Sequence, residues 1–193
     1  MVLWHKNAHI FQNDFPTVSL AFFNRYPNPY ASHVLSIDTI SRHIDSDGNL
    51  HSTRIIKKTG KLPRWVKPFL GRISESWIVE ISKVNRDDQI LSTYTRNLDH
   101  TRIIQVEEFT TYRYDNEEGI TKVESKVKFS SGFNIGIRNN IEEWSHRKFN
   151  ENIKKSRLGM TFVMEKLEEK RKMLHLWYEI LFSLELFHGL SAL

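Results

Sequence analysis

A long stretch near the C-terminal end, residues 139–172, constrains the fold more than any other part of the sequence. It contains no proline and one glycine, Gly159, so the pattern predicts a single long helix. At about 100° per residue, its large apolar side chains gather on one broad face that must be buried. This face consists of Ile141, Trp144, Phe149, Ile153, Met160, Val163 and Leu167.

Three polar residues lie in the middle of this apolar face. Lys148, Asn152 and Lys155 share its helical phase, and a buried ammonium group is costly unless an anion meets it. Nothing in the helix itself is expected to pair with either lysine at that position. The lysines therefore either bend back to water at the rim of a core, or border a cavity kept for an anion.

The rest of the chain is dominated by predicted strands. A strand at 5–12 precedes a helix over 17–24, which Asn13 or Asp14 caps and whose first turn accommodates Pro16. Further strands are predicted at 32–44, 49–58, 74–84, 89–97, 103–114 and 121–130. The expected fold class is α+β: about seven strands in an antiparallel meander, with one polar face and two helices covering the other.

Further cations share faces with apolar residues. Arg25 follows Val18 and Phe22 at helical spacing, so it lies on their side of the first helix. Lys58 and His33 have the strand parity of apolar neighbours, which makes both candidates for the interior, although a structural histidine is the commoner case. A curved sheet closed by one long helix can hold a cavity, and these cations would make it a site for phosphate or carboxylate.

The segment 59–71 combines two prolines with a tryptophan, a phenylalanine and two leucines beside basic residues. Proline excludes the interior of a strand, so a loop is expected. Loops are normally polar, and two interpretations remain open. The loop packs on the core, or it is a lid that touches a membrane.

Composition narrows the classes of function. The formal charge is +5 and the pI is about 9.4, which allows an anionic partner, but no block of lysine and arginine resembles a nucleic-acid arm. Without cysteine there is no thiolate nucleophile or zinc thiolate site. The N-terminus lacks the features of a signal or transit peptide.

Signs of catalysis are weak. The histidines lack metal-ligand spacing, and Glu107 and Glu108 point to opposite faces of a strand, so they cannot act together as an acid–base pair. We therefore expect no catalytic residue, metal or cofactor. Cations that can bind phosphate, without a base or nucleophile beside them, are more typical of a carrier than of an enzyme.

Six segments of the sequence, taken together, carry a resemblance to a known family. They are residues 25–30, 33–39, 61–65, 95–98, 127–133 and 144–159, which read RYPNPY, HVLSIDT, KLPRW, TRNL, VKFSSGF and WSHRKFNENIKKSRLG. In this order they resemble the PRELI (slowmo-type) family of mitochondrial lipid-transfer proteins over about residues 1–171. Within the family the chain is most similar to the fungal carrier of phosphatidic acid.

The resemblance implies a fold and a function. The fold would be START- and PITP-like, with a curved seven-stranded antiparallel sheet and a long C-terminal helix enclosing a lipid tunnel. The protein would work in the mitochondrial intermembrane space, peripheral on the inner membrane, and would carry phosphatidic acid from the outer membrane for cardiolipin synthesis. Implied partners are anionic mitochondrial membranes and a small twin-CX9C helical protein, and no nucleic acid.

The resemblance also implies roles for individual residues. The positions that match the family's headgroup-binding residues are Arg25, His33, Lys58, Lys148, Asn152 and Lys155. The positions that match its lid, which would contact the membrane, are Lys61, Leu62, Arg64, Trp65, Val66, Lys67, Phe69 and Leu70.

The C-terminal end departs from the family pattern. We assign residues 1–172 to the lipid-transfer domain and residues 173–193 to an apolar extension of unknown role. The extension is short for a membrane span and carries two glutamates, so an interfacial or self-associating helix is favoured over a spanning anchor. A divergent tail remains an open alternative.

Three other functions remain open. The chain could carry another phospholipid, phosphatidylserine above all. It could be a START-like enzyme, for which His33 is the available base. It could also be a scaffold that docks on anionic membranes without extracting a lipid.

Overall fold

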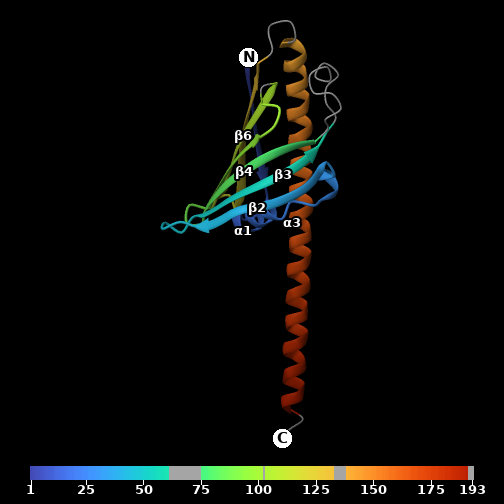
Figure 1. The fold of residues 1–193 in the computed structure, drawn as a ribbon. Helices are drawn as coiled ribbons and strands as arrows, with labels where there is room; N and C mark the ends of the chain where they lie inside the picture. Colours follow the sequence, from blue (N-terminus) through green and yellow to red (C-terminus); the bar gives the residue numbers. More distant parts are fainter. Residues whose placement is uncertain (61–74, 102, 133–137, 191–193) are drawn as a thin grey trace.

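The computed structural model describes residues 1–60, 75–101, 103–132 and 138–190, with the backbone alone for 138–139 and 179–190. The elements are β1 (Val2–Phe11), α1 (Phe15–Phe23), the 3-10 turn η1 (Pro29–Ala31), β2 (Val34–Ile44), β3 (Leu50–Thr59), β4 (Glu75–Asn85), β5 (Ile90–Asn97), β6 (Ile104–Asp115), β7 (Ile120–Ser131) and α3 (Arg138–Leu190) (Figure 1).

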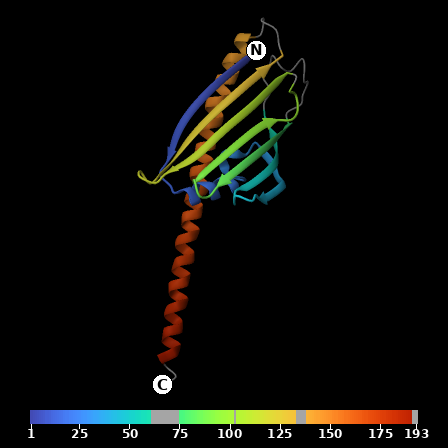
Figure 2. The same cartoon turned by 90° about the vertical axis from the view of Figure 1, so that its left-hand side faces the viewer.

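The strands form one antiparallel sheet of seven, in the order β1-β7-β6-β5-β4-β3-β2. Strands β2 to β7 form a meander, and β1 completes the sheet by pairing with β7. Helix α3 runs along one face of this sheet (Figures 1 and 2). The predicted α+β class, with its seven-stranded antiparallel sheet and long C-terminal helix, is confirmed.

Most predicted strand boundaries lie within two residues of the observed ones. The exception is β1, which begins at Val2 rather than residue 5, because Val2 pairs with Ser130 at the far end of β7. Helix α1 begins at Phe15 rather than residue 17, but one of the two predicted caps is confirmed: the Asp14 carboxylate accepts a hydrogen bond of 2.8 Å from the Thr17 amide.

The prediction of a polar outer face and an apolar inner face is wrong in part. Trp77 and Ile81 lie on the outer face of β4 and are 39% and 45% exposed, whereas Glu80 and Ser82, on the inner face, are 1% and 2% exposed. Glu80 pairs with the arginines of the charged site described below, and the Ser82 hydroxyl donates to the Ser52 carbonyl at 3.5 Å.

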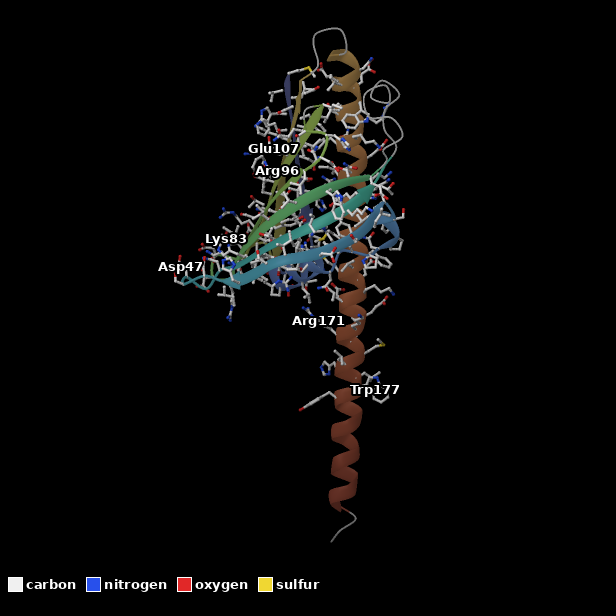
Figure 3. The ribbon with its side chains drawn as sticks, in the orientation of Figure 1. Asp47, Lys83, Arg96, Glu107, Arg171 and Trp177 are labelled. Carbon is white, nitrogen blue, oxygen red and sulfur yellow. The ribbon has the colours of Figure 1, made fainter. Side chains whose placement is uncertain are left out.

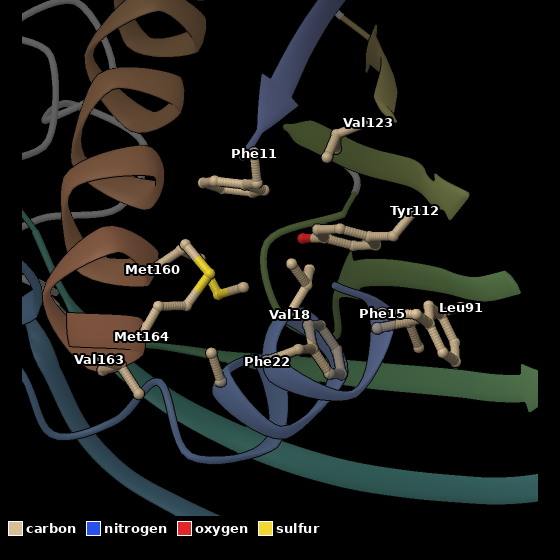
Figure 4. Close-up of a cluster of buried hydrophobic side chains, with 11 residues drawn as sticks. Phe11, Phe15, Val18, Phe22, Leu91, Tyr112, Val123, Met160, Val163 and Met164 are labelled. Atoms are coloured by element: carbon tan, nitrogen blue, oxygen red, sulfur yellow. The ribbon is translucent and has the colours of Figure 1, made fainter. Parts of the chain in front are cut away.

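The buried side chains form two clusters between the sheet and the helices. In the larger cluster, side chains of α1 pack between α3 and the sheet (Figure 4). Its members are Phe11, Phe15, Val18, Ala21, Phe22, Leu91, Tyr112, Val123, Met160, Val163 and Met164. The smaller one consists of Val127, Phe129 and Phe149, with Leu3, Val106, Trp144 and Ile153 packed against it. Burial of each large apolar side chain contributes about 1.5–3 kcal/mol.

Helix α3 is 53 residues long and extends past the sheet (Figures 1 and 3). Its predicted apolar face is buried at Ile141, Phe149, Met160 and Val163. Within the described ranges, no helix is both long and apolar enough to cross a membrane. The division of the chain at residue 172 stays a prediction, although the backbone is helical on both sides of it.

Candidate functional site

Two arginines and one glutamate form a buried ion cluster on the inner face of the sheet. Arg54 in β3 and Glu80 in β4 are directly opposite in the strand register, and Arg54 Nε lies 2.8 Å from Glu80 Oε1. Arg25, just after α1, donates to the other carboxylate oxygen of Glu80 through Nη2. The three side chains are 12% (Arg25), 4% (Arg54) and 1% (Glu80) exposed, so the cluster is shielded from water.

Helix α1 provides the other contacts of these guanidinium groups. Arg25 Nη1 donates to the Phe22 carbonyl (2.8 Å), and Arg54 Nη1 donates to the Phe23 carbonyl (3.0 Å). The C-terminal carbonyls of a helix attract cations. The guanidinium carbon of Arg25 also lies 4.1 Å from the centre of the Phe22 ring. The last turn of α1 therefore holds both cations in place.

One carboxylate for two guanidinium groups leaves a net positive charge. Burial raises the pKa of Glu80, but Arg25 and Arg54 outweigh it and hold that pKa below its usual value. Burial lowers the pKa of Arg25, and Glu80 outweighs that effect, so Arg25 stays protonated. The cluster therefore carries an excess of one positive charge, which favours an anion nearby.

A second group of cations lies around His33. Burial, and then the positive charges of Lys58, Lys155 and Lys148 in that order, together lower the pKa of His33 to about 4. These lysines come from β3 and α3, so the fold brings together cations more than 80 residues apart in sequence. Three of the residues predicted to bind a headgroup thus act electrostatically on a fourth, His33.

Strand parity alone does not explain the position of His33. It precedes β2, and a β-bulge between Val34 and Ser36 shifts the register against β3. Leu35, which lies two residues from His33 and so has the same strand parity, is 49% exposed. The extra residue of a bulge interrupts the alternation of faces along the strand. Residues on opposite sides of the bulge therefore cannot be assigned to a face by counting alternate positions.

A cavity of about 130 Å³ lies between β6, β7 and α3. Apolar side chains of the smaller core cluster form most of its wall, and Lys148, Asn152 and Glu108 add polar groups. Its full lining is Val106, Glu108, Val127, Phe129, Trp144, Lys148, Phe149, Asn152 and Ile153. An apolar wall with a few convergent polar groups is typical of a ligand site.

Glu108 contributes a half-buried carboxyl group to this wall. Burial raises its pKa, and the attraction of Lys58 and Arg25 does not outweigh that effect. Its hydrogen-bonding neighbour is the Thr110 hydroxyl at 3.5 Å. As predicted, Glu107 points to the other face, where it lies 3.1 Å from Lys128 Nζ.

The prediction that nothing in the helix pairs with Lys148 is wrong. Lys148 Nζ lies 2.9 Å from Glu151 Oε2, because residues three apart are neighbours on a helix surface. Asn152 and Lys155 are exposed rather than buried in the apolar face. Both open interpretations are therefore partly right: these side chains reach water, and Lys148 and Asn152 also border a cavity.

Arg25 is connected to the lysine group through Tyr26. Lys58 and Arg25 both lower the pKa of Tyr26 against the opposing effect of burial. The six predicted headgroup residues therefore lie in one region between the sheet and α3. All the predicted lid residues, 61–70, lie outside the described residues.

The sequence pattern did not identify Arg54, Glu80, Glu108 or Tyr26 as site residues. Arg54 shares the parity of Lys58, and Glu80 has the parity opposite to Trp77, so strand alternation contained a signal for both. Among the described residues, no three histidine, aspartate or glutamate side chains gather as a metal site requires. The arrangement is suited to binding an anion.

Comparisons with known proteins give a consistent picture of the chain. Residues 16–170 match the model of the PRELI-like family. The chain is 63% identical over 171 residues to "Protein UPS1, mitochondrial" of Saccharomyces cerevisiae, which covers 89% of this chain and 98% of that protein. It is 36% identical to "Protein ups1 homolog" of Schizosaccharomyces pombe (77% and 87% covered), and 32% identical to "PRELI domain-containing protein 1, mitochondrial" of Bos taurus (87% and 78% covered).

Solved structures with the same fold have little sequence similarity to the chain. TTHA0849 from Thermus thermophilus superposes with a TM-score of 0.54 at 10% identity, covering 86% of this chain and 99% of that one. Ara h 8.0201 superposes with a TM-score of 0.53 at 9% identity and the same coverage. At this identity the likeness extends to the fold alone.

Proposed function

Because this chain belongs to the PRELI-like family, we propose that it transfers phosphatidic acid between the outer and inner mitochondrial membranes and so supports cardiolipin synthesis. Similarity over almost the whole of a mitochondrial family member supports a lipid-transfer role. The proposed location is the intermembrane space, peripheral on the inner membrane. The proposed activity is that of a carrier, not an enzyme.

The observation that carries the proposal is the group of cations beside an apolar cavity. The charges of Lys58, Lys148 and Lys155 all act on His33, and Lys148 also lines the cavity wall. A phosphate monoester offers several acceptor oxygens and a full negative charge, and charge-assisted hydrogen bonds from lysine are strong. The apolar wall beyond the lysines suits the part of the lipid that follows the headgroup.

The size of the cavity indicates how much of the lipid it can hold. At about 130 Å³ it is smaller than the roughly 300–1,000 Å³ of typical small-molecule sites. A headgroup fits such a volume, whereas two acyl chains need more space than the cavity offers. We therefore propose that loading enlarges the space between α3 and the sheet, and the lipid tunnel stays a prediction.

The remaining partners follow from the family and are part of the proposal. Residues 61–70 would contact the membrane as a lid, with apolar side chains at the bilayer interface and basic ones at anionic headgroups. A small twin-CX9C helical protein would accompany the chain in the intermembrane space.

A lipid-transfer assay between donor and acceptor liposomes tests the carrier function. It compares fluorescent phosphatidic acid, phosphatidylserine and phosphatidylcholine, using the purified chain with a twin-CX9C partner. We expect Lys148→Glu to remove transfer of phosphatidic acid and leave the fold intact, because the side chain is 36% exposed and its ion pair with Glu151 contributes little to stability.

Lys154→Glu is the matched control, since Lys154 is an exposed lysine on the same helix that lies outside the cavity wall. It makes the same change of charge and should transfer like the wild type. Wild-type rates with Lys148→Glu would refute the headgroup site. Binding to liposomes without transfer by the wild type would refute the carrier and leave a docking scaffold.

Glu108 favours phosphatidylserine as the second candidate cargo. A carboxylate in the cavity wall could accept a hydrogen bond from the ammonium group of an aminophospholipid, which phosphatidic acid lacks. Under this alternative, Glu108→Gln would reduce phosphatidylserine transfer. Under the main proposal, it would leave phosphatidic acid transfer equal or faster, because it removes a negative charge beside the phosphate.

A further inference from the structure

The part of α3 that extends past the sheet exposes a run of large apolar side chains, interrupted by His175. Met173, Leu174, Leu176, Trp177 and Tyr178 are 57%, 70%, 57%, 63% and 70% exposed. Trp177 is seen on the projecting part of the helix in Figure 3. In the sequence the apolar character continues to residue 187, with glutamates at 179 and 185. A run of this size on a surface indicates an interaction site.

A cationic band directly precedes this apolar run. Residues 170–172 are Lys-Arg-Lys and all three are exposed. The nearest acids lie farther up the helix and already have partners: Glu168 accepts from Asn13 at 2.9 Å, and Glu169 lies 2.7 Å from Lys166. The cations therefore adjoin the first apolar side chains of the run, Met173 and Leu174, and Arg171 also donates to the Thr17 hydroxyl at 3.2 Å.

We propose that this part of α3, from residue 170 onward, is an interfacial anchor that binds an anionic lipid surface. Its apolar side chains would enter the boundary between headgroups and acyl chains, where tryptophan and tyrosine are favoured. The band at 170–172 would then lie at the level of the anionic headgroups. The family match ends at residue 170, so the anchor is a feature of this chain beyond the matched domain.

The charge pattern favours a lipid surface over a parallel pair of copies of the chain. Two parallel copies of α3 would bring the bands at 170–172 together, and like charges at close range repel. The two glutamates of the apolar run oppose deep insertion, which agrees with the finding that no helix in the described part of the chain could span a membrane. At the membrane interface, the apolar side chains can leave water while the charged groups stay hydrated or near the headgroups.

The anchor lies far from the lipid-binding cavity. Asn152 in the cavity wall and Trp177 are separated by roughly 38 Å along the axis of a continuous helix, at 1.5 Å per residue. Binding of the anchor would therefore leave the cavity accessible. The inference does not depend on the proposed cargo.

Vesicle flotation with the full chain tests the anchor. The vesicles are phosphatidylcholine with or without phosphatidylglycerol, an anionic lipid that is not the proposed cargo. We expect the double variant Leu174→Asp, Trp177→Asp to lower partitioning onto anionic vesicles by at least about tenfold, because two apolar anchors are lost and two negative charges are added. Both side chains are exposed, so thermal unfolding should not change.

Ile44→Asp is the matched control, because Ile44 is an apolar residue that is 70% exposed, like Leu174. It should bind vesicles like the wild type. Wild-type binding by the double variant, or an equal loss with Ile44→Asp, would overturn the anchor. It would also be overturned if sedimentation showed a dimer that the double variant abolishes while vesicle binding persists.

The transfer assay separates this inference from the proposed function. If the wild type transfers no lipid but the double variant still loses binding to phosphatidylglycerol vesicles, the anchor stands and the carrier proposal fails. If transfer of phosphatidic acid is normal and the double variant binds vesicles like the wild type, the carrier stands and the anchor fails.

Discussion

Among single residues, Glu80 organises the charged interior. Its carboxylate lies between Arg25 and Arg54, and it is almost completely buried. A buried ion cluster is stable only when all its members are present, because removal of one leaves the others without a partner in a medium of low dielectric constant. Glu80 therefore positions Arg25 at the end of α1 as well as stabilising the sheet.

Glu80→Gln should lower the free energy of unfolding by about 3–5 kcal/mol, because two buried guanidinium groups lose their counter-charge. Glu75→Gln in the same strand is the control. Glu75 is 51% exposed and pairs with Lys57 at 2.7 Å, so it should cost less than about 1 kcal/mol. Urea unfolding measures both, and equal effects would show that the buried cluster does not stabilise the fold.

His33 should make stability depend on pH. Its pKa is lowered to about 4 in the folded chain by burial and the three lysines, against an ordinary value of 6.5. The unfolded state therefore binds more protons between these values, so stability is complete above pH 6.5 and falls as the pH drops towards 4. His33→Gln should reduce this loss in unfolding measurements at about pH 7 and about pH 4.5.

NMR titration of His33 gives an independent measurement of the same effect. We expect a pKa of about 4 without lipid and a higher value with phosphatidic acid bound, since an anion would offset the charges of Lys58, Lys148 and Lys155. A pKa at the ordinary value of 6.5 in the lipid-free chain would contradict the clustering of these residues.

Among the elements, α3 depends on Gly159 to let the turn after α1 pack closely on it. The Asn28 side chain accepts from the Tyr30 amide at 2.8 Å and donates to the Arg25 carbonyl, so it shapes the turn that carries Arg25. A Cβ atom at residue 159 would lie 2.9 Å from Asn28 Nδ2. The glycine inside this long helix thus leaves room for the Asn28 side chain rather than serving a special backbone conformation.

Gly159→Ala should destabilise the chain by about 1–3 kcal/mol through this overlap, although helix propensity alone would favour alanine by about 1 kcal/mol. Ser156→Ala is the control on the same helix, because Ser156 is exposed and its change should be neutral or slightly stabilising. Thermal unfolding compares the two. A stabilising effect of Gly159→Ala would show that Asn28 moves aside at little cost.

In the molecule as a whole, α3 joins three regions with different tasks. Its first half lines the cavity with Lys148 and Asn152, and its middle buries Met160 and Met164 against α1 and the sheet. Its last part extends past the sheet with exposed apolar side chains (Figure 1). One continuous helix thus places a candidate lipid site and a candidate anchor at a constant separation.

Much of this architecture could be predicted from short-range patterns. Period-two alternation identified the strands, and the proline-free run at 139–172 identified the long helix with its buried face. The same patterns singled out Arg25, Lys58 and Lys148 as inward cations. Where alternation was interrupted, as at the bulge beside Leu35, the prediction was wrong, because one extra residue exchanges the faces of a strand.

Which segments become strands and helices follows from the sequence alone, since that depends on neighbours within a few residues. Which charges meet depends instead on the tertiary structure. Glu80 lies 55 positions from Arg25, and Lys148 lies about 90 positions from Lys58. Whether these residues meet depends on the strand register and on how α3 packs against the sheet. The strand register and the position of α3 are determined by packing of the whole core, and the periodicity of short sequence segments does not predict them.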